Sequence, residues 1–260
     1  MNSKQPPIVL VFAGNDPSGG AGLCADIQAL ASQGCHTAPV VTCITTQDTR
    51  NVLENIPLSG QTVAAQAEAV LNDMPIAACK IGLLGTVEIV DAIQYVLLKY
   101  PHIPVILDPV LAAGGGHSLM QGKVCEAIIN KLLPLIKVIT PNSPEARALT
   151  GGTLSLDAAA TQLMDYGCQY VCITGTHEDT PLVVNTLYGQ GQRLQSWRWS
   201  RLPYSYHGSG CTFASSLAGF LAQGKDVLTA VYKAQVYTWT SLQCGYLPGH
   251  GQALPNRLFK

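Results

Sequence analysis

The stretch from His207 to Thr212 holds the residue types that a small anion-binding catalytic turn requires. It reads His-Gly-Ser-Gly-Cys-Thr and precedes an apolar run, 213–221, with the composition of a helix. The first N–H groups of a helix lack partners within it, and the helix dipole favours negative charge there. Cys211 would lie where a thiolate forms most easily. A plain tight turn followed by a small core cysteine fits the same residues, so the stretch alone leaves both interpretations open.

Other polar residues come directly after segments that have the composition of strands. They are Asn15 and Asp16, Gln47, Asp108, Asn142 with Glu145, and Thr174. In an open parallel sheet the carboxyl ends of the strands lie along one edge, where ligands bind. Each residue alone is weak support because loops are polar anyway. Their accumulation predicts a ligand site at that edge.

The segments that must position these residues alternate between strand-like and helix-like. Strands are predicted over 8–12, 39–45, 77–81, 105–107, 138–140 and 170–173. Helices are predicted over 23–33, 62–74, after Thr86, near 124–133, from Pro144, and over about 212–222 and 226–243. The runs 182–187 and 193–199 resemble an antiparallel pair, and 114–116 a flexible glycine segment. This order predicts an α/β fold with a mainly parallel sheet and a small antiparallel edge pair.

Composition narrows the class of protein. The chain has 260 residues without a repeat or linker, which favours a single domain over 1–260. Its 15 basic and 16 acidic residues form no run of one sign, which argues against a nucleic-acid partner and for a small ligand. No apolar segment is long enough for a bilayer or a signal peptide, so we expect a cytoplasmic protein without a membrane partner. Nine cysteines without a CxxC pair indicate reduced thiols rather than zinc.

Two nucleotide-binding fingerprints do not occur in the sequence. The glycine-rich segment 14–22 contains no lysine and no GxxxxGK[ST] pattern, and no GxGxxG follows a predicted strand and opens a helix. The interpretation of the chain as a dehydrogenase therefore loses its main support in the sequence. Any phosphate site in this chain must have another design.

Five ordered motifs resemble those of hydroxymethylpyrimidine/phosphomethylpyrimidine kinase, a family of the ribokinase-like superfamily. They are 13–22 with Ala25-Asp26, Lys80-Ile81-Gly82, Asp108-Pro109-Val110, 139–146 and 207–212. The resemblance implies a three-layer α/β/α ribokinase-like fold. It also implies ATP-dependent phosphorylation of 4-amino-5-hydroxymethyl-2-methylpyrimidine, and then of its monophosphate, in thiamine biosynthesis. A homodimer and a monovalent cation requirement are left open.

The resemblance also implies which residues hold the pyrimidine. Asp26 and Gln47 would bind the ring, with Gly14, Leu83 and Val110 lining its pocket. A carboxylate and an amide suit a ring that bears an amine donor and nitrogen acceptors. Asp26 could equally be a solvated or capping carboxylate, and Gln47 an ordinary loop amide.

Asn142 and Glu145 match the superfamily's NxxE pattern, which is associated with Mg²⁺ and phosphate. Asp108 would support the same region, with Asp108 and Glu145 holding the metal directly or through water. The alternative for Asn142 and Glu145 is a capped helix start. The nucleotide candidates include Thr174 and Thr176, although the family usually has a lysine at Thr174. Lys233 could supply a cation or be a solvated helix lysine, and His177 and His207 are interpreted as structural.

By the same resemblance, Cys211 accepts the proton of the attacking hydroxymethyl oxygen. A thiol with a pKa of about 8.5 would need the helix start to lower it. Phosphoryl transfer depends mainly on positioning and charge stabilisation, so the amides of the turn, at Gly208, Ser209 and Gly210, could matter more than the thiol. Two alternatives stay open: a pyridoxal kinase, and a non-catalytic pyrimidine-binding protein, for which Thr174 is the best support.

Overall fold

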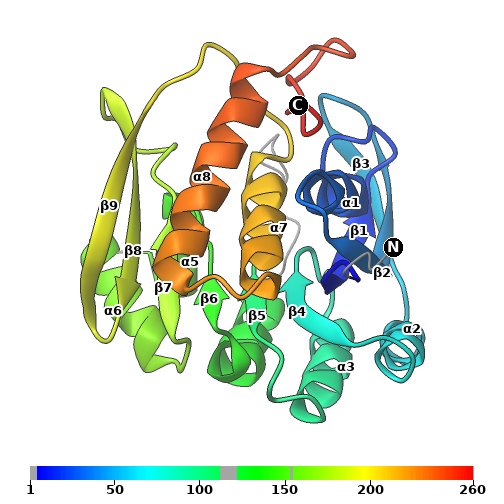
Figure 1. The fold of residues 1–260 in the computed structure, drawn as a ribbon. Helices are drawn as coiled ribbons and strands as arrows, with labels where there is room; N and C mark the ends of the chain where they lie inside the picture. Colours follow the sequence, from blue (N-terminus) through cyan, green and yellow to red (C-terminus); the bar gives the residue numbers. More distant parts are fainter. Residues whose placement is uncertain (1–4, 112–121, 153–154, 260) are drawn as a thin grey trace.

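In the computed structural model, residues 5–111, 122–152 and 155–259 are described, and their strands form one sheet (Figure 1). The strands are β1 (Ile8–Asn15), β2 (His36–Gln47), β3 (Val52–Pro57), β4 (Ile76–Ile81), β5 (Val105–Leu107), β6 (Val138–Ile139), β7 (Tyr170–Ile173), β8 (Leu182–Gly189) and β9 (Gln192–Ser200). Their order is β3-β2-β1-β4-β5-β6-β7-β8-β9. Pairing is parallel from β2 to β7, and antiparallel for β3 at one edge and for β8 and β9 at the other.

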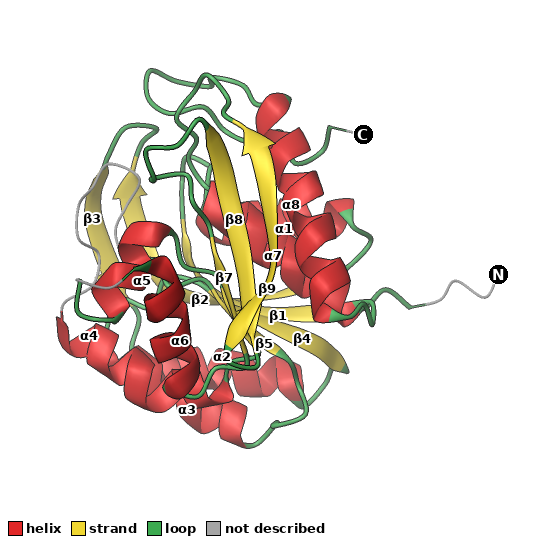
Figure 2. Cartoon of the chain, turned by 90° about the vertical axis from the view of Figure 1, so that its left-hand side faces the viewer, coloured by secondary structure: helices red, strands yellow, loops and turns green. Residues whose placement is uncertain are grey.

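Helices cover both faces of this sheet (Figures 1 and 2). One face carries α1 (Gly22–Ser32), α7 (Ser209–Ala222) and α8 (Val227–Gln243), which share an apolar cluster with the strands. The other carries α2 (Gly60–Leu71), α3 (Val87–Leu98), α4 (Gly122–Ala127), α5 (Ser143–Leu149) and α6 (Leu156–Asp165) over a second cluster. The three-layer α/β/α prediction is confirmed.

Local chemistry explains why these elements form where they do. β1 is an uninterrupted apolar strand, buried along nearly its whole length, as expected for a central strand with helices on both faces. The helix predicted after Thr86 is α3, and the Thr86 hydroxyl accepts a hydrogen bond from the N–H of Ile89. Its apolar stripe, including Ile93, is buried on the sheet.

Several elements differ from the sequence prediction. β2 continues to Gln47, which was expected in a loop, because β3 pairs with it. A turn built by Asp48, whose Oδ1 accepts the N–H groups of Arg50 at 2.7 Å and Asn51 at 2.8 Å, joins the two strands. α6 was not predicted. The helix expected over 124–133 is α4, followed by a π-helical turn over Ile128–Leu132 and a 3₁₀ turn over Leu133–Leu135 that contains Pro134, which lacks an N–H.

Three further sequence predictions concern the start of α7, membrane-spanning helices and the segment 114–116. α7 begins at Ser209, three residues before its predicted start, and this places Cys211 in its first turn. Among the described helices, none combines the length and apolarity needed to cross a membrane. The glycine segment 114–116, expected to be flexible, lies outside the described residues.

Candidate active site

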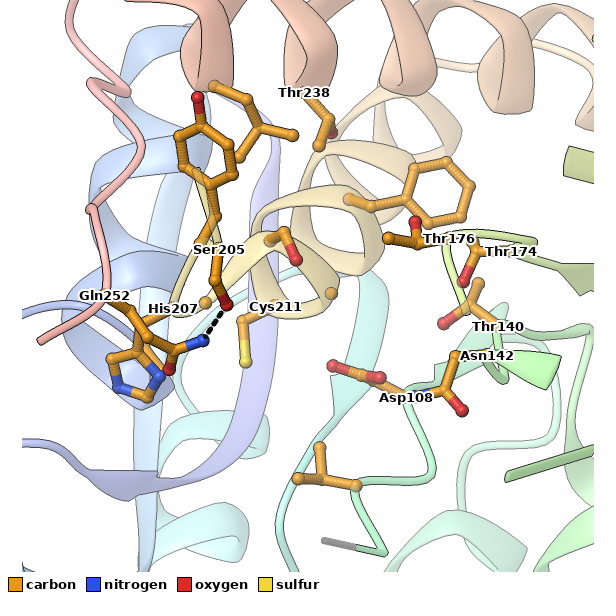
Figure 3. Close-up of a pocket in the computed structure, with 18 of the residues that line it drawn as sticks. Asp108, Thr140, Asn142, Thr174, Thr176, Ser205, His207, Cys211, Thr238 and Gln252 are labelled. Atoms are coloured by element: carbon orange, nitrogen blue, oxygen red, sulfur yellow. Dashed lines mark hydrogen bonds between the residues drawn. The ribbon is translucent and has the colours of Figure 1, made fainter. Parts of the chain in front are cut away.

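A cavity of about 480 Å³ opens at the carboxyl ends of the parallel strands (Figure 3). The structure brings most of the sequence-predicted residues together in its wall: Gly14, Gln47, Leu83, Asp108, Val110, Asn142, Glu145, Thr174, Thr176, Gly208, Ser209, Gly210 and Cys211. In Figure 3, Cys211 lies between His207 on one side and Asp108, Asn142 and Thr174 on the other. The predicted site at this edge of the sheet therefore exists as a shared cavity.

The first turn of α7 presents free backbone donors to the cavity. Gly208 caps the helix with a left-handed backbone, φ 79°, and a Cβ there would overlap the carbonyl group of Gly20. The first backbone hydrogen bond within the helix is donated by the N–H of Thr212 to the Gly208 carbonyl oxygen, at 3.0 Å. The amides of Ser209, Gly210 and Cys211 consequently have no partner within the helix, and they form an anion cradle.

Arg257 holds this turn in place from behind and was not predicted from the sequence. Its buried guanidinium donates to the Thr212 hydroxyl at 2.8 Å, the Gly208 carbonyl at 3.5 Å and the Gln28 amide oxygen at 3.2 Å, and also to the Gly20 carbonyl. A single cation thus joins the glycine-rich loop after β1 to the start of α7. Nothing in the local sequence signals this, because the partners are far apart along the chain.

The thiol of Cys211 differs from the sequence expectation. Burial raises the pKa of Cys211 to about 12, the nearby Lys80 ammonium lowers it, and the carboxylates of Asp108 and Asp26 raise it further. The helix start therefore does not lower this pKa as expected, because desolvation and negative neighbours outweigh it. In the ligand-free site the thiol is protonated at neutral pH.

Asp108, which is buried, and Glu145, which is partly buried, are two neighbouring carboxyl groups with raised pKa values. Burial raises the pKa of Asp108 to about 6, against the opposing effect of Lys80. Burial together with the charge of Asp108 raises the pKa of Glu145 to about 8. Asp108 Oδ2 is buried and, among the described residues, has no hydrogen-bond partner. The charge of Lys80 therefore offsets the burial of this pair only in part.

The capped helix start that was considered for Asn142 and Glu145 is confirmed. Asn142 Oδ1 accepts the N–H of Glu145 at 2.9 Å, and Glu145 Oε2 accepts the N–H of Asn142 at 2.9 Å. A metal role is compatible with this box, since Mg²⁺ needs only one or two carboxylates besides phosphate oxygens and waters. No larger cluster, of three or more His, Cys, Asp or Glu side chains suited to a metal, occurs within the described ranges.

Asp26 occupies neither of the positions considered for it from the sequence. It is fully buried, with both carboxylate oxygens 3.0 Å from Lys80 Nζ, and the Ser215 hydroxyl donates to it at 2.6 Å. Lys80 lines the cavity, whereas Asp26 lies behind it. Lys233 is exposed on α8, 5.7 Å from the centre of the Phe220 ring, and the structure does not bring it to the cavity.

A third polar group, around His207, joins three segments where Gln47 lines the cavity. His207 Nε2 lies 2.8 Å from Asp16 Oδ2 and 3.1 Å from the amide nitrogen of Gln47. Burial alone would raise the pKa of Asp16, but hydrogen bonds from His207 and Ser18 outweigh it and lower that pKa to about 2. His207 was interpreted as structural, and the only sequence signal for its role was its place beside the glycine turn.

The opposite end of the cavity is aromatic and amide-rich. Gln235 Oε1 accepts hydrogen bonds from Asn185 Nδ2 and Trp199 Nε1, both at 2.9 Å. Arg201 donates to the carbonyl oxygens of Thr176 at 2.9 Å and Thr180 at 2.8 Å. All of these side chains except Thr180 line the cavity. Arg201 therefore places a positive charge in the wall near Thr174, where a lysine was expected.

A mainly parallel sheet covered on both faces, with a helix start opposite two carboxyl groups, defines a phosphotransferase of the ribokinase-like class. The chain belongs to the phosphomethylpyrimidine kinase family, whose model matches residues 16–256. It is 38% identical to hydroxymethylpyrimidine/phosphomethylpyrimidine kinase of Haemophilus influenzae, over 98% of this chain and 97% of the relative.

Two solved structures extend the comparison. A pyridoxal kinase from Staphylococcus aureus, in complex with AMP-PCP and pyridoxal, has a TM-score of 0.88 and 31% identity, over 97% of this chain and 94% of that one. A phosphomethylpyrimidine kinase from Clostridium difficile has a TM-score of 0.78 and 31% identity, over 89% of this chain and 97% of that one. The fold is therefore common to both kinds of kinase.

Proposed function

We propose that this chain, as one kinase domain, transfers a phosphoryl group from ATP to the hydroxymethyl group of 4-amino-5-hydroxymethyl-2-methylpyrimidine. The monophosphate is then phosphorylated to the diphosphate, as a step of thiamine biosynthesis. The observation that carries this proposal is one cavity in which the open amides of α7 face Asp108 and Glu145, with Gln47 at its other end. A cytoplasmic location, a homodimer and a monovalent cation stay predictions.

In this proposal the pyrimidine lies at the Gln47 end of the cavity. The Gln47 amide offers both a donor and an acceptor to the aminopyrimidine edge. Gly14, Leu83 and Val110 supply the wall beside the ring. A Cβ at Gly14 would overlap the buried thiol of Cys43, so glycine is the residue that fits this part of the wall.

The phosphates lie between the α7 cradle and the carboxyl pair. The amides of Ser209 to Cys211 bind the transferring phosphoryl group, and the hydroxyls of Thr174 and Thr176 bind the nucleotide. Asp108 and Glu145 would hold Mg²⁺, partly through water, and the metal supplies neutralisation of phosphate charge. The unpartnered Asp108 Oδ2 supports this fit.

Cys211 lies within the first turn of α7, beside the cradle that receives the phosphoryl group. Because its thiol is protonated in the ligand-free site, it becomes a base only where a bound cation favours the thiolate. The transition state of phosphoryl transfer is loose and depends mainly on charge stabilisation. The cradle amides therefore contribute more to catalysis than the thiol does.

The close structural likeness to a pyridoxal kinase makes pyridoxal the second candidate substrate. One assay separates the possibilities: purified protein with ATP and Mg²⁺, offered the hydroxymethylpyrimidine, its monophosphate and pyridoxal separately. We expect turnover of both pyrimidines. Turnover of pyridoxal alone would overturn the proposal, and tight pyrimidine binding without transfer would indicate a non-catalytic binding protein.

A further inference from the structure

The contact between Asp16 and His207 has no part in the phosphoryl transfer described above, yet it touches the residue that we assign to the substrate ring. The side chains of His207 and Asp16 are 14% and 4% exposed, and their closest atoms, Nε2 and Oδ2, are 2.8 Å apart. The same His207 nitrogen lies 3.1 Å from the Gln47 amide. Three segments, the loop after β1, the end of β2 and the turn before α7, therefore meet at one ring nitrogen.

The position of one proton on His207 follows from Asp16. Asp16 accepts backbone hydrogen bonds from Ser18 at 2.8 Å and Ala21 at 2.7 Å, and with a pKa of about 2 it is ionised at neutral pH. An ionised carboxylate can only accept hydrogen bonds. The nitrogen that faces it, Nε2 of His207, must therefore carry a hydrogen and donate it.

The ring of His207 has little freedom to turn away. Its backbone N–H donates to the Ala253 carbonyl oxygen at 2.9 Å. The ring packs on Gly20 so closely that a Cβ at this glycine would overlap ring carbon Cδ2. The donor direction of Nε2 is consequently fixed by the fold.

This proton decides how the Gln47 amide is oriented. An NH₂ group facing a protonated Nε2 brings two donors together, which is unfavourable. A half-turn about the last side-chain bond exchanges the nitrogen and oxygen ends, which have nearly the same shape. The favoured arrangement therefore has Gln47 Oε1 on the His207 side, where it shares the single Nε2 hydrogen with Asp16, and the NH₂ group on the far side.

We propose that Asp16 and His207 are positioning residues that fix this order of acceptor and donor on Gln47, and thereby select rings with an amino group beside the reacting hydroxymethyl arm. His207 belongs to the same turn as Cys211, so the acceptor end of Gln47 is the end nearer the reacting arm. In the aminopyrimidine, the group next to that arm is an amine donor, and the following ring nitrogen is an acceptor. In pyridoxal the corresponding group is an aldehyde, whose oxygen would face another acceptor.

This inference rests on the proposed function, and its first test compares two substrates in one variant. His207→Phe keeps a flat ring but removes the donor, and His36→Phe, at an exposed position on β2, is the matched control. We expect the ratio of kcat/KM for the aminopyrimidine to that for pyridoxal to fall about ten-fold in His207→Phe, as for one lost hydrogen bond. The change should arise in KM for the ring, with KM for ATP unchanged. An unchanged ratio, or an equal loss for both rings, would overturn the inference.

The second test needs neither a variant nor turnover. In ¹⁵N NMR of the wild-type protein at neutral pH, we expect His207 to carry hydrogen on Nε2. A ring protonated on Nδ1 alone would overturn the inference even if the kinase activity is as proposed. If instead the wild type fails to phosphorylate the aminopyrimidine while Nε2 carries the proton, the proposed function fails, and the ratio of dissociation constants for the two rings then tests the selection.

Discussion

The two ends of the cavity differ in whether their charged side chains are paired within the protein. At the Gln47 end, Asp16 is paired with His207, and behind the cavity wall Asp26 is paired with Lys80. At the phosphate end, Asp108 and Glu145 lie close together with raised pKa values, and one Asp108 oxygen has no partner within the described chain. The charges at one end are therefore balanced within the protein, whereas the carboxyl pair at the other end is where we propose that Mg²⁺ binds together with the nucleotide.

The largest effect should come from the residue between the two ends. We expect Cys211→Ala to lower kcat roughly 10²-fold, the lower limit for a positioned proton acceptor, because the thiol is protonated before ligands bind. Steady-state kinetics with the pyrimidine, and its dissociation constant by calorimetry, separate catalysis from binding. Exposed Cys244→Ala is the control. An unchanged kcat removes Cys211 from the base role.

Asp108→Asn tests the uncompensated end directly. We expect kcat to fall about 10²-fold, as when one electrostatic contact to the transition state is removed. At the same time the free energy of unfolding at neutral pH should rise on the order of 1 kcal/mol, because a buried and repelled charge is lost. Denaturant unfolding measures the second effect. Asp91→Asn, at a half-exposed ion pair with Lys131, should change neither. A loss of both activity and stability would contradict the comparison.

Asp16→Asn tests the paired charges near Gln47 through the pH dependence of the free energy of unfolding. Burial would raise the pKa of Asp16, but hydrogen bonds from His207 and Ser18 lower it from 3.8 to about 2. A lowered pKa stabilises the fold at pH values above 3.8, and this contribution is lost as the pH falls to about 2. It amounts to about 2 kcal/mol, which the variant should lack at neutral pH. Urea unfolding between pH 2 and 7 measures it, and parallel stability curves for both proteins would refute the pairing.

The smallest expected effect comes from adding a cation to the phosphate end. Thr174→Lys places an ammonium in the cavity wall where the family resemblance leads us to expect a lysine, and KM for ATP should fall about five-fold, the equivalent of about 1 kcal/mol. Thr161→Lys, on the exposed side of α6, controls for net charge. A rise in KM for ATP would mean that Arg201 already fills this role.

The sequence was sufficient to predict the positions where polar residues leave the sheet, because each depends on a local strand followed by a loop. Asp108 and Asn142 were found in this way, whereas the turn before Cys211 was found from its glycines and the helix-like run that follows. The charge pairs were not, because Asp26 meets Lys80, and Arg257 meets Gly208, only after distant segments pack together. β3 was missed for a related reason. Its residues are mostly exposed, including the apolar Leu53 and Ile56, so they carry no core pattern, and the strand exists because it pairs with β2.

The buried Arg257 also constrains when the site can form. Its guanidinium donates hydrogen bonds to the carbonyl oxygens of both Gly20 and Gly208. The hydroxyl of Tyr237 donates to the backbone carbonyl oxygen of Arg257 at 2.8 Å. During synthesis Arg257 leaves the ribosome long after its hydrogen-bond partners Gly20, Gly208 and Thr212. The anion cradle therefore reaches its final geometry late in folding, through contacts between segments far apart in sequence, which are the slow ones to form. Hydrogen exchange at the start of α7 should consequently report the docking of 252–257 rather than the helix itself.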